Sequence, residues 1–355
     1  MPSLTKAKEE VLIALSVRRL IERGWLTALL GFLIKREELS VRLKYIGDVR
    51  LRWKTFGALA ISTYYAIKYA SKCWPKLPED LAKTGRLFKP QEDPLWLVTA
   101  LSLASYACRL QASGNRVSID VSPERVGLAV NGVSVAFNPS CVNFGSLIEI
   151  FIEGEYDVSE VLSGLKGKEV VDVGASVGDS ALYFLLNGAR KVIAVEPLPK
   201  VARCAEENVR LSGATDKVKV LNAALSSGPT SVPCDYDVFS SGAFSTLKGS
   251  GPCRVPGVTL DDLLDMIDDP YLLKIDCEGC EAQVILGPER ERLRAFEHII
   301  LETHPHNTGV SDEKLLASLK ELGFECRLHM THDPKLGVNI YHCKNSKLRQ
   351  LNRTF

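Results

Sequence analysis

The segment KEVVDVGASVGDSALYFLLNGARKVIAVEP, residues Lys168–Pro197, carries the strongest structural signal in this 355-residue chain. Its opening run, Glu169–Val173, is apolar and β-branched, as in a parallel strand that is buried on both faces. A glycine-rich turn and a helical segment follow, and Lys191–Val195 is a second run of the same kind. This order predicts a βαβ unit whose turn and helix start face a ligand.

The residues at the two strand ends indicate which ligand this unit holds. Glu196 follows the second strand, where a carboxylate can accept hydrogen bonds from the two hydroxyls of a ribose. Asp172 stands two residues before the turn, where it would repel a pyrophosphate but could bind the ammonium group of a methionine moiety. The sequence therefore favours S-adenosylmethionine over a dinucleotide, with a plain crossover that binds no ligand as the alternative. We expect these residues to hold the cofactor: Asp172, Gly174, Ala175, Ser176, Gly178, Glu196, Pro197, Asn222, Ala223 and Asp276.

Three more strands are predicted to end at the same edge of the sheet: Lys217–Leu225, Tyr271–Gly279 and His298–His304. Helical patterns separate them, and Phe324–Met330 with Val338–Cys343 forms a final antiparallel pair. Strands that alternate with helices predict a doubly wound α/β sheet, here with seven strands. Ligands of such sheets bind outside the carboxyl ends of the strands.

Four motifs resemble the FkbM family of class I S-adenosylmethionine-dependent methyltransferases: DVGASVGD (172–179), VEP (195–197), LLKIDCEGCE (272–281) and LETHP (301–305). The resemblance covers about Glu149 to Cys343, and the block Lys274–Glu281 is its most specific part. Ser176 stands where the family usually has Asn, and Cys280 where it usually has a small apolar residue. The resemblance implies a Rossmann-like methyltransferase fold, S-adenosylmethionine as cofactor and O-methylation, often of sugar or polyketide hydroxyls.

Composition divides the chain into parts of different character. The first 110 residues hold 19 Lys and Arg against 10 Asp and Glu, whereas the whole chain has a net charge of only +1. All four tryptophans lie in this first part, and all six histidines lie between His298 and His342. We therefore predict a basic, mainly helical N-terminal domain over 1–113, a β-hairpin connector over 114–148 and the methyltransferase domain over 149–355. Asn131-Gly132 is a strong signal for the hairpin turn.

The ten cysteines are scattered, and no secretory leader precedes the first helical pattern. We expect reduced cysteines and a cytoplasmic location. Cys277 and Cys280 form a lone Cys-x-x-Cys, which we interpret as packing residues because a zinc site would need further ligands. Glutamine is scarce, with four residues in the chain, as in heat-adapted proteins.

Two apolar runs, Gly24–Ile34 and Leu95–Cys108, are too short to span a bilayer, which needs roughly 20 residues. Both are predicted to be buried helices. A peripheral membrane contact is the alternative, because basic residues and tryptophans lie in or near both runs.

Methyl transfer to a hydroxyl needs a base within hydrogen-bond reach of the acceptor. His304 is our candidate, because it leaves a strand at the ligand-binding edge and histidine titrates near neutrality. His306 is the second choice, and Asp276 and Glu278 are expected to position the hydroxyl. These four side chains could instead converge on a divalent ion. No compact ligand motif supports that alternative, so we expect no metal.

The flanking segments are expected to shape the site. Phe151 or Tyr156 could lie over the cofactor. The irregular loop Ser227–Pro256, with Tyr236, Phe239 and Phe244, is the best candidate for acceptor selection, and a surface insertion with two short edge strands is the alternative.

Three functions remain open on the sequence alone. The first is methylation of a hydroxyl on a small molecule, a sugar or a lipid-linked glycan. The second is methylation of tRNA or rRNA, with residues 1–110 binding phosphates. The third is a non-catalytic nucleoside-binding protein, against which the acids and His304 at one edge argue.

Overall fold

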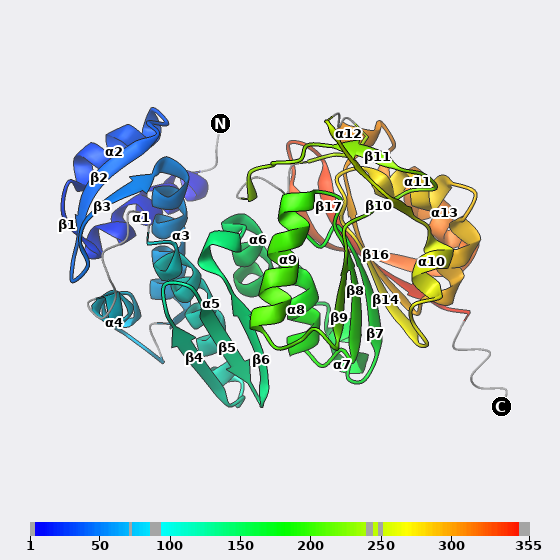
Figure 1. Cartoon of the computed structure of the whole chain (residues 1–355), viewed down its shortest axis with the longest axis horizontal. Helices are drawn as coiled ribbons and strands as arrows, with labels where there is room; N and C mark the ends of the chain where they lie inside the picture. The colour runs from blue at the N-terminus through cyan, green and yellow to red at the C-terminus, as the bar shows by residue number, and fades with distance from the viewer. Residues whose placement is uncertain (1–3, 71–72, 86–93, 239–243, 248–250, 348–355) are drawn as a thin grey trace. The chain divides into compact units, whose positions relative to one another are not determined.

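The computed structural model describes residues 4–70, 73–85, 94–238, 244–247 and 251–347 (Figure 1). It divides the chain into two compact units, Met1–Glu153 and Gly154–Phe355. No helix in these described ranges is long and apolar enough to cross a membrane.

The first unit is built from helices and two small antiparallel sheets. Its elements are α1 (Leu4–Ser16), η1 (Val17–Arg19), β1 (Ile21–Arg23), α2 (Trp25–Leu33), β2 (Glu38–Leu43), β3 (Gly47–Arg52), α3 (Trp53–Ala70), α4 (Leu77–Thr84), α5 (Leu95–Ala112), β4 (Val117–Val121), β5 (Val126–Val130), β6 (Val133–Phe137), η3 (Pro139–Cys141), α6 (Phe144–Ile148) and η4 (Glu149–Glu153). The expected hairpin is confirmed: Asn131 and Gly132 have φ of 53° and 95°, as a two-residue turn between β5 and β6 requires.

The sheet β1–β2–β3 was not expected from the sequence. Leu39 and Val41 on β2 and Leu51 on β3 are buried, and exposed residues stand between them. This period of two identifies half-buried strands. The apolar run in α5 is buried as expected. The expectation for α2 was wrong in part, because several of its large apolar side chains are exposed.

The second unit contains a seven-stranded sheet in the order β16-β17-β15-β14-β7-β8-β9. The elements of this unit are α7 (Ser159–Gly164), β7 (Glu169–Val173), α8 (Asp179–Leu186), β8 (Lys191–Val195), α9 (Pro199–Leu211), β9 (Val218–Leu221), β10 (Ala224–Leu225), β11 (Thr230–Val232), β12 (Cys253–Val255), β13 (Gly257–Val258), α10 (Leu260–Leu264), β14 (Pro270–Ile275), α11 (Cys280–Leu286), η6 (Arg290–Ala295), β15 (His298–Thr303), α12 (Pro305–Thr308), α13 (Asp312–Leu322), β16 (Phe324–Asp333) and β17 (Val338–Asn345).

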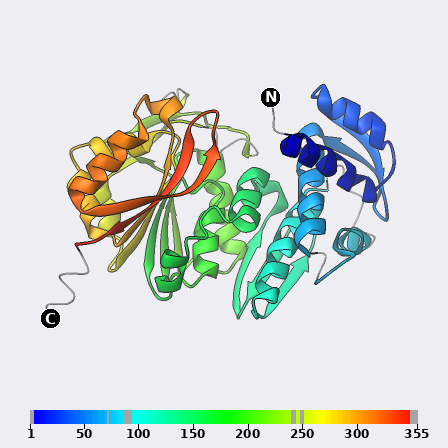
Figure 2. The same cartoon turned by 180° about the vertical axis from the view of Figure 1, so that it is seen from behind.

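The strands β9, β8, β7, β14 and β15 are parallel, and β17 joins β15 and β16 in antiparallel fashion. Helices α8 and α9 cover one face, while α10, α11 and α13 cover the other (Figure 1). The β16–β17 pair, drawn in orange and red, forms one edge (Figure 2). The predicted α/β class and Rossmann-like methyltransferase sheet are thus confirmed. The strand order reverses between β7 and β14, which is where such sheets bind ligands.

Several predicted elements in the second unit end earlier than expected, among them the strand predicted over Tyr271–Gly279, since β14 ends at Ile275. The third strand stops at Leu221, and Ala224–Leu225 pairs separately with β13. The predicted helix over 280–294 ends at Leu286, because Pro288 cannot continue an α-helix and a 3-10 helix begins only at Arg290. In the loop after β10, Tyr236 and Phe244 pack edge to face at 5.2 Å. Residues 239–243 and 248–250 of this loop lie outside the described residues.

The expectation of reduced cysteines was wrong: the described residues contain no free cysteine. Disulfides join Cys73 to Cys108, Cys234 to Cys253, Cys277 to Cys280 and Cys326 to Cys343. Their pairing depends on distances across the fold, which sequence spacing does not reveal.

Candidate functional site

The glycine turn after β7 is fixed by close backbone approach. Gly174 has a φ of 78°, and a Cβ at this position would lie 1.6 Å from the carbonyl oxygen of Asp276. Its N–H and that of Ala175 both donate to the Val195 carbonyl at 3.0 Å. Only glycine fits position 174, so the turn holds β7, β8 and β14 together at the carboxyl edge.

The turn continues into α8 through two residues with positive φ. Ser176 has a φ of 46° and Gly178, the N-cap of α8, has 81°. The Ser176 N–H donates to Glu196 Oε2 at 3.0 Å. The predicted turn residues and the predicted ribose carboxylate therefore meet.

Glu196 lies at the end of β8 and is 5% exposed. Burial raises the pKa of its carboxyl to about 8, although hydrogen bonds from the Leu198 and Ser176 N–H groups oppose that shift. Each carboxylate oxygen accepts one of these bonds, which leaves lone pairs for further donors. Asn222 lies beside it and donates to the Glu196 and Pro197 carbonyls at 3.0 and 3.1 Å.

Asp172 lies beneath the turn rather than on an open surface. It is fully buried. Its carboxylate accepts a hydrogen bond from the Ser180 hydroxyl at 2.7 Å and forms an ion pair with Lys274 at 3.2 Å. Lys274 is 1% exposed and also donates to the Gly174 carbonyl at 2.7 Å. Burial alone would lower the pKa of Lys274, but Asp172 and Asp276 outweigh it and raise that pKa. Asp172 thus braces the turn through Lys274.

His304 forms a cluster with three carboxylates: Asp276 and Glu278 in the loop after β14, and Glu302 on β15. His304 Nε2 lies 3.9 Å from Asp276, 3.6 Å from Glu278 and 3.9 Å from Glu302. The imidazole is only 2% exposed. The three predicted catalytic residues therefore lie together. His306 stands next to His304, with ring centroids 5.9 Å apart.

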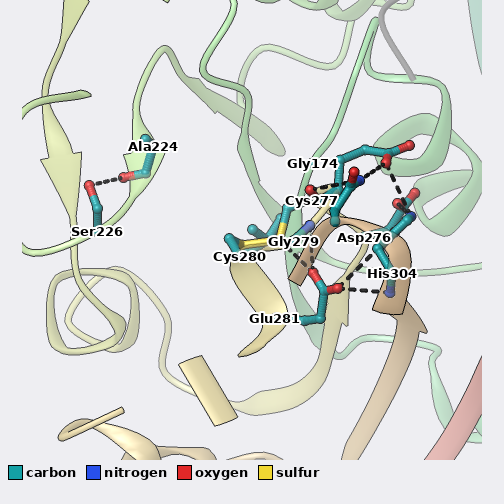
Figure 3. Close-up of a disulfide and its surroundings, with 12 residues drawn as sticks. Gly174, Ala224, Ser226, Asp276, Cys277, Gly279, Cys280, Glu281 and His304 are labelled. Atoms are coloured by element: carbon teal, nitrogen blue, oxygen red, sulfur yellow. Dashed lines mark hydrogen bonds and ion pairs between the residues drawn. A yellow bond between two sulfur atoms is a disulfide. The ribbon is translucent and has the colours of Figure 1, made fainter. Parts of the chain in front are cut away.

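Glu281 fixes the backbone of this cluster through hydrogen bonds. It is fully buried, and its two oxygens accept the Gly279 and His304 backbone N–H groups at 2.8 and 2.9 Å. Its Oε1 also lies 3.3 Å from His304 Nδ1. Figure 3 shows Asp276, Glu281 and His304 facing one another beside the Cys277–Cys280 disulfide.

The charges of the cluster are strongly coupled. Burial raises the pKa of Glu278 to about 7, and burial together with Asp276 raises the pKa of Glu302 to about 7. Burial would raise the pKa of Asp276 too, but Lys274 and His304 outweigh it and lower that pKa. For His304, burial lowers the pKa, and the surrounding carboxylates overcome this and raise it to about 9.

The cluster has two further neighbours: Tyr156, which the sequence analysis singled out, and His332, which it missed. The Tyr156 hydroxyl donates to Asp276 Oδ2 at 3.2 Å, whereas Phe151 packs within the first unit against Tyr106 and Phe137. His332 on β16 lies 2.8 Å from Glu302. Only the strand register brings His332 here, so no local pattern could have revealed it.

Two sets of side chains, which share Glu302, have potential metal-ligand atoms within 4.8 Å of one another. They are Glu155, Glu302 and His332, and Asp276, Glu302 and His304.

Comparison with known protein families shows which kind of domain contains this sheet edge and its cluster of residues. Residues 172–326 match the model of the methyltransferase FkbM domain. The chain carries a methyltransferase FkbM domain. It is an S-adenosylmethionine-dependent methyltransferase, as its motifs predicted.

The chain is also similar to individual known proteins. Over 212 residues, half of the chain, it is 26% identical to "Methyltransferase sdnD" from Sordaria araneosa, and it covers 80% of that protein. A solved putative rRNA-methylase from Clostridium thermocellum has 10% identity and a TM-score of 0.36, over 53% of this chain and 94% of the other. An O-methyltransferase from Bacillus cereus has 12% identity and a TM-score of 0.33, over 54% and 79%.

The residues of the FkbM domain fit S-adenosylmethionine. The turn carries no cation that would bind a pyrophosphate, and Glu196 keeps free lone pairs for the hydroxyls of a ribose. Gly174 lets the turn lie directly against the Asp276 backbone, because a Cβ here would be 1.6 Å from the Asp276 carbonyl oxygen. The acids around His304 suit a donor whose sulfonium is positively charged.

Proposed function

We propose that this chain methylates a hydroxyl on a small molecule, a sugar or a lipid-linked glycan. The observation that carries the proposal is the cluster at the ends of β14 and β15, where His304 Nε2 lies within 3.9 Å of three carboxylates. It stands beside the cofactor turn, because Asp276 touches Gly174 through its backbone.

S-adenosylmethionine supplies an activated methyl group, so the protein has to align the acceptor and remove its proton. We assign proton removal to His304, whose Nε2 faces the acids at the edge. Asp276 and Glu278 accept hydrogen bonds and can orient the hydroxyl for attack. Glu281 holds the His304 backbone, so that the imidazole keeps its position as it gains a proton.

For the cofactor, we assign the ribose hydroxyls to Glu196, with Pro197 shaping the following turn. We assign adenine binding to Asn222 and Ala223, which directly follow β9. The methionine moiety falls to the turn residues Gly174, Ala175, Ser176 and Gly178. Asp172 supports them through Lys274, and Asp276 borders both ligands.

We further propose that the reaction needs no metal. The cationic Lys274 and His304 face Asp276 and its neighbours, and two of the carboxyls have pKa values near 7. Lys274, His304 and protonated carboxyls can therefore balance the negative charge of the cluster without a metal ion.

The competing acceptor is RNA, which the basic composition of residues 1–110 favours. Several of these cations are already paired: Arg42 contacts Glu22 and Asp48, and Lys83 contacts Asp80. Composition alone therefore overstates the charge that is free to bind a phosphate backbone, and we favour the small hydroxyl acceptor because the His304 cluster suits it.

We also propose a cytoplasmic location, in a heat-adapted cell. Disulfides are rare in most cytoplasmic proteins but common in intracellular proteins of hyperthermophiles. The disulfides and the four glutamines in 355 residues both fit such a cell.

Calorimetry with S-adenosylmethionine tests the cofactor assignments. Glu196→Ala should weaken binding about 10- to 100-fold, because the ribose hydroxyls lose their acceptor. Asp172→Ala should also weaken binding, because it removes the carboxylate partner of Lys274 and loosens the turn. Glu206→Ala, an exposed carboxylate on α9, is the matched control. If the wild type fails to bind, the cofactor assignments are wrong.

Turnover of a panel of hydroxyl acceptors and of RNA tests the chemistry. His304→Ala should lower turnover about 10²- to 10⁴-fold while cofactor affinity stays unchanged. Excess chelator should leave the rate intact. A loss in His306→Ala but not in His304→Ala would move the base to the neighbouring histidine. Methylation confined to RNA would replace the proposed acceptor.

A further inference from the structure

Exposed large apolar side chains gather in one short part of the first unit. Among the described residues, thirteen such side chains are exposed, and seven lie between residues 11 and 34. They are Val11, Leu12, Leu15, Leu26, Leu30, Leu33 and Ile34. A concentration of this kind on a monomer usually marks a surface that contacts something other than water.

Helix α2 carries the most exposed members. Leu26, Leu30 and Leu33 are 64–67% exposed, and Ile34, the C-cap that follows the helix, is 77% exposed. Their spacing of four, three and one residues places them on one face of a helix. The opposite face is held against β2 through small residues, because a Cβ on Gly31 would lie 2.5 Å from the Leu39 side chain. The fold therefore fixes α2 in place and turns its leucines outward.

Cations that have no carboxylate partner among the described residues flank this apolar face. Arg18, Arg19 and Arg23 precede α2, and Lys35 and Arg36 follow it; all five are exposed. In the described part of the chain, none of them forms an ion pair with a carboxylate, although Arg18 and Lys35 lie over the rings of Trp25 and Trp53.

The nearby acids do not offset these cations fully. Glu22 pairs with Arg42, and Glu38 lies 3.9 Å from Arg50. Glu37 is the remaining exposed acid in this stretch. The apolar face is thus bordered by positive charge at both ends of α2.

We propose that α2 and its flanking cations dock this protein onto a membrane surface that carries anionic headgroups. An outward row of leucines with basic residues at both ends is the composition of an interfacial helix. The apolar side chains enter the boundary of the acyl chains, while the arginine and lysine stems reach up to the phosphates. An acidic protein surface could satisfy the charges, but lipids offer anions at both ends of the helix and an apolar layer between them.

Sedimentation with vesicles tests this proposal on the full-length protein. The wild type should bind vesicles of phosphatidylcholine with about one third phosphatidylglycerol, more weakly at high salt, and bind pure phosphatidylcholine at least tenfold less. The double variant Leu30→Glu/Leu33→Glu should lose tenfold or more of the binding to anionic vesicles. Both leucines are exposed, so the variant keeps the native packing.

The matched control is Leu328→Glu/Leu336→Glu, which changes two leucines of the second unit that are 55% and 49% exposed. This control should bind vesicles as the wild type does. The proposal is overturned if the wild type ignores anionic vesicles, or if the α2 variant binds them normally. It is also overturned if the wild type is a dimer that the α2 variant dissociates, since a second copy would then cover the face.

Discussion

At the residue scale, His304 shows how a buried side chain can remain charged. Removal from water disfavours the imidazolium, but Glu281, Asp276, Glu302 and Glu278 surround it and favour the charged form more strongly. The pKa of about 9 means that His304 holds its proton at neutral pH. A base with this pKa is mostly inactive there and becomes available only as the pH rises.

Turnover should therefore rise with pH and level off near the pKa of His304. Below about pH 9 the fraction of deprotonated His304 grows about tenfold per pH unit, and the rate should follow it. The positive sulfonium of the cofactor would lower this pKa, so the plateau should be reached earlier with cofactor bound. A pH profile of kcat measures the effect. In His304→Gln the slope should vanish, and a wild-type profile that is flat between pH 6 and about 9 would remove His304 from the role of base.

At the element scale, the loop between β14 and α11 places Glu278 on a covalently closed turn, and Asp276 directly precedes that turn. Cys277 and Cys280 form a disulfide across it. Within the turn, Glu278 has a φ of 56° and Gly279 a φ of 130°, and the first of these is unfavourable for a residue with a side chain. Asn307 also donates to Glu278 Oε2 at 2.8 Å. The disulfide and these contacts hold Glu278 in a conformation that an open loop would leave.

Opening this disulfide should therefore reduce turnover without weakening the cofactor site. Cys277→Ser/Cys280→Ser should lower kcat about tenfold, because small displacements of catalytic groups are costly. Affinity for S-adenosylmethionine should change little, since Glu196 lies on another loop. Cys73→Ala/Cys108→Ala, which opens a disulfide of the first unit, is the control and should keep its turnover. Wild-type kcat in the serine variant would show that the disulfide does not position the acids.

The elements also show where sequence reasoning succeeded and where it failed. Continuous β-branched runs such as Glu169–Val173 identify buried parallel strands, and their order gives the sheet and the edge where Asp276 and His304 meet. In the short strands β1–β3, charged residues stand between apolar ones. In stretches this short, the same pattern also occurs in exposed helices. The disulfides and the approach of His332 to Glu302 depend on tertiary distances and register, which no local pattern encodes.

At the scale of the whole molecule, disulfides brace both compact units. Cys73–Cys108 lies in the first unit and closes a separation of 35 residues. Cys234–Cys253 and Cys326–Cys343 lie in the second unit, with separations of 19 and 17. In the chain-entropy model, loops of this size contribute roughly 3 to 4 kcal/mol each by restricting the unfolded chain. Such contributions support the proposal of a heat-adapted cell.

Reduction should therefore lower the thermal stability of both units. A contribution of about 3 kcal/mol corresponds to a fall in Tm of about 6 to 12 °C for a unit of this size. Scanning calorimetry with and without a dithiol reductant measures the shift, and thiol labelling confirms that the bonds are open. In Cys73→Ala/Cys108→Ala only the transition of the first unit should fall, because the unfolded second unit keeps its crosslinks. Unchanged transitions in fully reduced protein would show that packing alone supplies the stability, and would remove the argument for a heat-adapted cell that rests on the disulfides.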